Sequence, residues 1–110
     1  TESILTPIKV LLRDLPGVEI EPPFLSVSGI EVAADAPVVK RLSAAAGKVL
    51  GTAKVEVVPY ATDAGVYNRA GIPTVVFGPG DVAQAHTEDE FIDLKDLDRA
   101  FRILRQLIGG

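Results

Sequence analysis

The chain has 110 residues, of which 47% are hydrophobic and 24% are charged, and its formal net charge is −4. This composition is typical of one globular domain or less, and it excludes an intrinsically disordered chain. No cluster of lysine or arginine is present, so neither nucleic acid nor a membrane is expected as a partner. No apolar run approaches the roughly 20 residues needed to cross a bilayer.

Cysteine and methionine are both absent from the sequence. Without cysteine there can be no disulfide framework and no thiolate metal site, which is compatible with the cytoplasmic location that we expect. A natural reading frame begins with methionine, so we expect that the sequence has lost its start or belongs to a longer protein. The first residues also lack the basic start of a signal peptide.

The amino-terminal part predicts a helix followed by a strand. Thr6 is suited to cap the helix and Pro7 to occupy its first position, and apolar residues recur on one helical face as far as Pro16-Gly17. Residues 18–21 alternate apolar and acidic side chains, as a half-buried strand does. Residues 22–34 contain prolines, serines and a glycine without a helical period, and are therefore the best candidate for a linker.

The middle of the chain predicts helix, strand, helix and strand in turn. A helix opens at Asp35-Ala36-Pro37 and is ended by Gly51, which stands where a left-handed residue belongs. Residues 54–58 and 74–77 are expected to be strands, and a short helix capped by Thr62 lies between them. Strand, helix and strand in so short a stretch form a βαβ unit with parallel strands, so the predicted fold class is α/β.

A final helix is expected after residue 93. Asp93 is suited to cap it, and Asp96 in the first turn suits the positive end of the helix dipole. Its arginines are expected to face solvent. The expected apolar face consists of Leu94, Leu97, Phe101, Leu104, Leu107 and Ile108.

Candidate ligand-binding residues follow the two predicted strands. Ligands of parallel sheets bind at the carboxyl ends of strands, and the turn Gly78-Pro79-Gly80 there would let backbone N–H groups approach a ligand. A tight turn without a ligand explains the same residues, and no dinucleotide fingerprint is present. Thr62 and Asp63 lie at the same expected edge, where they either face a ligand or simply cap the helix.

His86 is the only histidine, and acidic residues follow it at 88–90. Its imidazole suits a zinc ion, with a neighbouring carboxylate orienting the second ring nitrogen, or it serves as a general base. A surface histidine in a solvated acidic loop is the alternative. Zinc takes three or four protein ligands, so most of a coordination shell would have to come from elsewhere. Ser26 and Ser43 lie on no nucleophile elbow, and serine hydrolysis is not expected.

Four stretches, in this order and spacing, resemble the carboxyl-terminal end of the dinuclear-metal peptidases and deacylases. That family includes acetylornithine deacetylase, succinyl-diaminopimelate desuccinylase and carboxypeptidase G2. The stretches are residues 60–64, 71–74, 77–80 and 83–90. Residues 1–28 are similar to the end of the family's lid or dimerisation domain, and residues 29–110 to the carboxyl-terminal part of its catalytic domain.

The resemblance implies that His86 is the last metal ligand, that Gly78, Pro79 and Gly80 line the substrate pocket, and that Thr62 and Asp63 lie near it. It implies no catalytic residue in this chain, because the family's glutamate base and remaining ligands lie upstream. The lid of the family usually supplies a histidine to the partner subunit's site. Residues 1–28, which resemble the lid, contain no histidine.

The full-length enzyme is expected to use two zinc or cobalt ions to cleave N-acyl amino acids or small peptides, as a homodimer. This chain alone is expected to have an incomplete metal site, weak metal affinity and little or no activity. One alternative is a non-catalytic binding or dimerisation module on the same scaffold. An unpaired strand edge at 18–21 would favour dimerisation, because it can pair with a strand of another chain. A phosphate-binding α/β module is a weaker alternative, because acidic residues surround His86.

Overall fold

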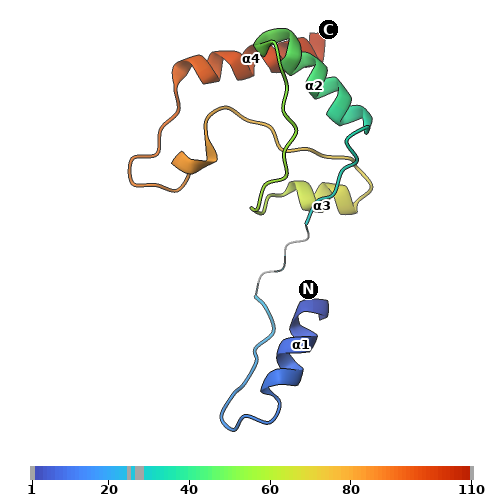
Figure 1. Ribbon diagram of the computed structural model, residues 1–110, viewed down its shortest axis with the longest axis vertical. Coiled ribbons are helices and arrows are strands. Elements are labelled where there is room, and N and C mark those ends of the chain that lie inside the picture. Colours follow the sequence, from blue (N-terminus) through green and yellow to red (C-terminus); the bar gives the residue numbers. More distant parts are fainter. Residues whose placement is uncertain (1, 25, 27–28, 110) are drawn as a thin grey trace.

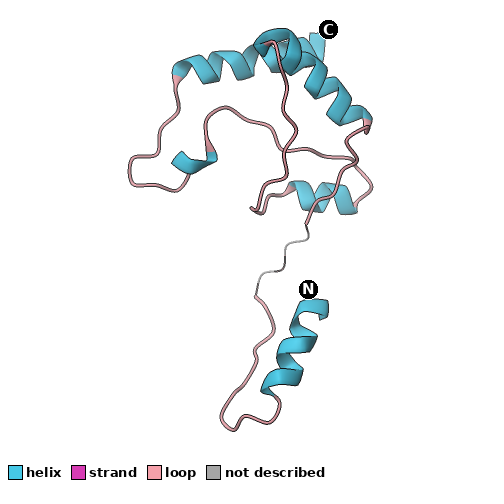
Figure 2. Cartoon of the chain, in the orientation of Figure 1, coloured by secondary structure: helices cyan, strands magenta, loops and turns pink. Residues whose placement is uncertain are grey.

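The computed structural model describes residues 2–24, 26 and 29–109. Its helices are α1 (Glu2–Leu12), α2 (Pro37–Leu50), α3 (Ala64–Arg69) and α4 (Leu94–Gly109), and a single 3-10 turn, η1 (Val82–Gln84), precedes α4 (Figure 1). Figure 2 shows that loops join these helices and that the described residues form no strand. None of the helices in this part of the chain is both long and apolar enough to cross a membrane.

The pair α2 and α4 forms the core, and it is the one helix pair in substantial contact within the described ranges. The side chains of Ala45 and Ala46 on α2 meet Ile103 of α4, which is only 2% exposed. Alanines at the contact let the two helices approach closely, so the larger side chain of Ile103 fills the space between them. Leu42, Val49 and Leu107 pack around this centre.

The predicted start and end of α2 and the predicted start of α4 are confirmed. Pro37 occupies the start of α2, and Gly51 ends it with φ 79° while donating its N–H to the carbonyl of Gly47 at 2.9 Å. At the start of α4, the Asp93 carboxylate accepts a hydrogen bond from the N–H of Lys95 at 2.8 Å. Both helix ends therefore follow from residues that lie next to them in the sequence.

The predicted start of α1 is wrong. The helix begins at Glu2, so Thr6 and Pro7 lie inside it and Thr6 is not the cap. Pro7 stands at the middle of this 11-residue helix, where it removes one hydrogen bond from the helical ladder. The apolar side chains of Ile4 and Leu11 remain 68% and 77% exposed, so the described part of the chain leaves most of the predicted face of α1 uncovered.

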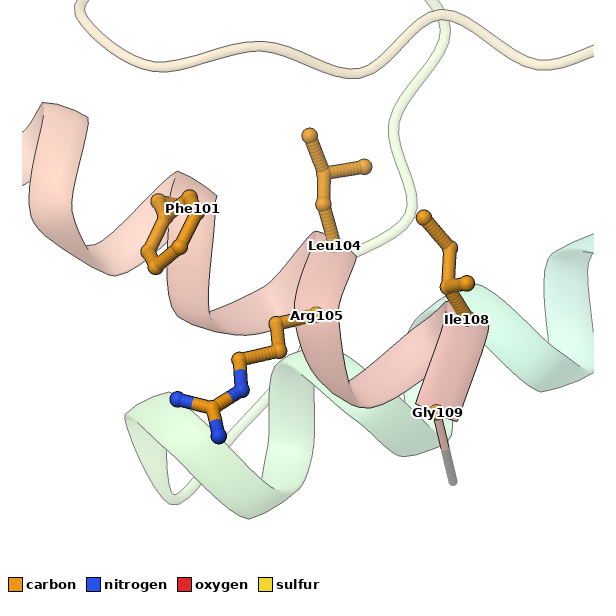
Figure 3. A pocket seen from close by; sticks show the side chains of 5 residues that line it. All are labelled: Phe101, Leu104, Arg105, Ile108 and Gly109. Atoms are coloured by element: carbon orange, nitrogen blue, oxygen red, sulfur yellow. The ribbon is translucent and has the colours of Figure 1, made fainter.

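The predicted apolar face of α4 is also partly wrong. Ile103 faces α2, Ala100 is also buried, and only Leu107 of the expected face packs against this core. Phe101 and Ile108 are 63% and 86% exposed. Figure 3 shows that these two side chains and Leu104 project along one side of α4. The helix therefore carries two apolar surfaces, of which one is covered and one is not.

The segments predicted as strands run as extended connections. Residues 18–21, 54–58 and 74–77 have no strand hydrogen bonding, and Val57 is 99% exposed. A strand is stabilised by the neighbours with which it pairs, and the described residues bring none beside these segments. The intervening helix α3 does form, and the expected stop at Gly71 follows it with φ 81°. The βαβ arrangement and the α/β fold class stay predictions.

The whole chain is far from compact. Its radius of gyration is 19.2 Å and its principal extents are 60 × 36 × 19 Å, whereas a compact domain of about 100 residues has a radius near 13 Å. Figure 1 shows α1 apart from the pair α2 and α4. The expected linker at 22–34 contains no helix or strand where it is described. The expected domain boundary after residue 28 falls at a position outside the described residues and stays a prediction.

Candidate metal and substrate site

Thr62 and Asp63 lie at the amino end of α3. The Thr62 hydroxyl accepts a hydrogen bond from the N–H of Ala64 at 3.2 Å, and its carbonyl accepts one from Gly65 at 3.3 Å. Thr62 therefore caps the helix, as its position predicted. The Asp63 side chain makes no capping hydrogen bond and is exposed. Its carboxylate is available to a ligand, whereas the Thr62 hydroxyl already accepts a hydrogen bond at the start of the helix.

The turn Gly78-Pro79-Gly80 is exposed to solvent. Gly80 has φ 87°, a left-handed conformation that favours glycine, and a Cβ added to it would lie 3.8 Å from the Ile92 side chain. No atom lies within 4 Å of the place where a Cβ on Gly78 would stand. The backbone of the turn is thus open at Gly78 and lies beside the Ile92 side chain at Gly80.

The loop that carries His86 is held by its own polar groups. The Asp81 carboxylate accepts from the N–H of Ala83 at 2.9 Å, which begins η1. The Thr87 hydroxyl then donates to the carbonyl of Gln84 at 2.8 Å. The backbone N–H of His86 donates to Oε2 of Glu90 at 3.2 Å. These bonds define a local turn although no other element packs the loop into a core.

His86 itself is exposed and has φ 58°, a value that few residues other than glycine adopt. Within the described ranges, its ring forms no hydrogen bond or ion pair. An exposed imidazole on an ordered loop fits a single ligand position of a metal centre. The same ranges contain no group of three or more histidine, cysteine, aspartate or glutamate residues that could hold a metal ion. The donor set of this chain therefore fits part of a coordination shell and not a whole one.

Two hollows on the surface of the molecule lie away from these residues. These open hollows on α2 and α4 have volumes of about 340 Å³ and about 250 Å³. The larger one (Figure 3) is lined by Phe101, Leu104, Arg105, Ile108 and Gly109. Neither hollow is lined by the glycine turn, by Thr62 and Asp63 or by His86. The substrate pocket expected at these residues stays a prediction.

The hydrogen bond from His86 to Glu90 was missed by the sequence reasoning, which treated the acidic residues at 88–90 as one cluster. The spacing of four residues was the available signal, because a turn brings such residues together. The structure separates the three acids: Glu90 bonds to the loop, and the side chains of Glu88 and Asp89 make no hydrogen bond within the described part of the chain.

The comparisons with known proteins agree with the motifs. A model of peptidase family M20/M25/M40 matches residues 12–109. Because this match covers most of the chain, the chain belongs to that family. The resemblance to the family of acetylornithine deacetylase, inferred from the four motif stretches, is thereby confirmed.

Several deacetylases are similar to this chain. An acetylornithine deacetylase of Aliivibrio salmonicida is 36% identical over 91 residues, which are 83% of this chain and 22% of the relative. An acetylornithine deacetylase of Myxococcus xanthus is 33% identical over 100 residues, or 90% of this chain and 25% of the relative. An N-acetyl-L-citrulline deacetylase of Xanthomonas campestris is 42% identical over 53 residues, or 48% of this chain and 14% of the relative.

The chain thus spans a quarter or less of the length of each of these relatives. No solved structure gives a significant match.

Proposed function

We propose that this chain supplies one metal ligand and part of the pocket wall to a metal-dependent hydrolase of N-acyl amino acids, of the acetylornithine deacetylase type. The observation that carries the proposal is the family match over residues 12–109, together with relatives that are named deacetylases of acetylated amino acids. The exposed imidazole of His86 on its ordered loop supports the assignment of that residue as the ligand.

The division of labour follows from the chemistry of these residues. His86 would hold one of two zinc or cobalt ions, which supply a water of lowered pKa and polarise the scissile carbonyl. The open backbone of Gly78-Pro79-Gly80 would lie against the substrate, where a side chain would obstruct it. Asp63 and Thr62 would border the same pocket from the start of α3. No general base is assigned to this chain, because the proposed glutamate base lies upstream.

The proposed substrate is a small N-acyl amino acid or peptide, and the proposed assembly is a cytoplasmic homodimer. In this proposal the 110-residue chain alone has little or no activity, because its described residues hold no complete metal shell. A non-catalytic binding or dimerisation module is the second candidate. The extensive exposed apolar surface favours it, because such surface is typical of a protein that packs against a partner.

A His86→Ala substitution in the full-length protein tests the proposal. The variant and the parent would be loaded with zinc or cobalt and assayed for release of the free amine from N-acetylornithine and N-acetylcitrulline. We expect a loss of at least about 100-fold in kcat/KM, since a direct metal ligand is removed. Glu88→Ala, which changes a neighbouring exposed side chain that makes no hydrogen bond within the described ranges, is the control. Unchanged activity of His86→Ala would remove His86 from the site, and an inactive parent would favour the non-catalytic module.

A further inference from the structure

We propose that Glu90 is a positioning residue for His86: its carboxylate holds the histidine backbone in the left-handed conformation and so sets the direction of the imidazole. The inference rests on the proposed function, since it concerns the same ligand. It assigns to one carboxylate of the acidic run a task that neither the motif nor the family match specifies.

The conformation of His86 needs a cause. Within the described ranges it is the one residue other than glycine with a positive φ, at 58°. Sterics between the Cβ and the backbone make this region uncommon for side-chain-bearing residues, although histidine enters it more often than most. Residues 86–90 are exposed, and Gln84 and Ala85 before them are only half-buried, so no tightly packed core holds the backbone in place. Hydrogen bonds within the loop are what remains to stabilise it.

Glu90 makes the bond that closes this loop. Its Oε2 accepts the N–H of His86 at 3.2 Å, and its own N–H donates to the carbonyl of Thr87 at 3.2 Å. Glu90 is therefore attached to the turn through both its side chain and its backbone. A charged acceptor makes a stronger hydrogen bond than a neutral one. The acceptor binds the amide of His86 and not its ring, so the ring nitrogens stay available to a metal.

Backbone conformation decides where the imidazole can point. A change of φ at His86 from positive to negative swings its Cα–Cβ bond, and the ring moves with it. A ligand held in its bound orientation before the metal arrives loses less conformational freedom on binding. Glu90 would thus raise the metal affinity without touching the metal or the ring, as residues behind metal ligands commonly do.

The first measurement concerns the bond itself. In metal-free full-length protein, hydrogen–deuterium exchange at the His86 amide would be compared between the parent, Glu90→Gln, Glu90→Ala and Glu88→Gln. We expect protection of this amide to fall about fivefold in Glu90→Ala and less in Glu90→Gln, which keeps an acceptor oxygen. Glu88→Gln removes the same charge from a side chain without a hydrogen bond and should leave the protection unchanged. Equal protection in all four proteins would overturn the inference.

The second measurement is zinc affinity, determined on the same variants by competition with a chelator. We expect about tenfold weaker binding for Glu90→Ala, an intermediate value for Glu90→Gln and a change below about twofold for Glu88→Gln. If His86→Ala weakens zinc binding and Glu90→Ala does not, the inference is wrong and the proposed function stands. If His86→Ala binds zinc as tightly as the parent, the proposed function fails, while amide exchange still reports whether Glu90 holds the His86 backbone.

Discussion

Single residues with a positive φ mark the places where this chain changes direction. Gly51, Gly71 and Gly80 adopt this conformation at the ends of α2, α3 and the extended segment that follows α3. Glycine lacks the Cβ that makes the left-handed region unfavourable, so each reversal is encoded by one residue. His86 adopts the same conformation with a side chain, and it does so at the one position that the family resemblance assigns to a metal.

Two glycines of the same region should respond oppositely to alanine. Gly51 has φ 79° and Gly47 lies inside α2, and a Cβ at either position would meet no atom within 4 Å. An added Cβ would therefore find equal space at both positions, and only the backbone conformation differs between them. Gly51→Ala should lower the free energy of unfolding by about 1 kcal/mol because of left-handed strain. Gly47→Ala should raise it by about 0.5–1 kcal/mol because alanine favours a helix.

Urea denaturation of both variants, followed by circular dichroism, would measure these changes. A gain in stability from Gly51→Ala would contradict the left-handed assignment at the end of α2.

At the scale of elements, the contact between α2 and α4 depends on which side of α4 faces its partner. Ile103 is 2% exposed against Ala45 and Ala46, whereas Ile108 is 86% exposed five residues further along the same helix. The guanidinium of Arg41 donates to the carbonyl of Leu107 at 3.4 Å, which adds a polar contact between the two helices. The covered side of α4 is thus rotated by about one residue position from the apolar face that its leucines and phenylalanine predict.

Ile103→Ala and Ile108→Ala form a matched pair for this contact. Both remove the same atoms from the same helix, so helix propensity cancels. In the 110-residue chain, Ile103→Ala should cost about 2–4 kcal/mol or abolish the cooperative transition, since it opens a cavity in a small core. Ile108→Ala should change the free energy of unfolding by less than about 0.5 kcal/mol. Chemical denaturation would measure both, and equal costs would show that α4 does not pack as described.

At the scale of the whole molecule, much of the apolar surface has no cover. Phe24, Val57 and Ile108 are each more than 80% exposed, and the buried core is confined to a few residues, mostly on α2 and α4. Soluble monomers rarely expose large continuous apolar patches, so this surface is suited to contact with further protein. The uncovered segments include the predicted strand at 54–58 and the second half of the one at 74–77, which would gain both pairing and cover from the same contact.

The isolated chain should therefore behave differently from the full-length protein. We expect the chain to bind the dye ANS and to self-associate with rising concentration, because both processes cover apolar surface. The full-length protein should bind little dye. Fluorescence and sedimentation velocity would measure the two effects. A chain that stays monomeric and binds no dye would contradict the description of an exposed apolar surface. If Phe101→Ser reduces self-association, the surface that self-associates includes α4.

The sequence by itself determined the features that depend on near neighbours. The start of α4 at Asp93, the end of α2 at Gly51 and the cap at Thr62 were all predicted, because each is made by atoms a few residues apart. The family was also readable from the order and spacing of the motifs, which need no fold. The start of α1 at Glu2 does not follow from local preference, because proline favours the first helical position and Pro7 lies inside this helix.

Only the tertiary structure decided which stripe of α4 is buried, and only the observed path of the local turn decided which acid bonds to His86. Periodicity indicates a set of apolar positions, but the shape of the partner selects among them, and the small side chains Ala45 and Ala46 admit Ile103. Likewise, three acids follow His86 in the sequence, and only the path of the turn brings the carboxylate of Glu90 to its amide. Both outcomes depend on distances between atoms that the order of residues does not contain.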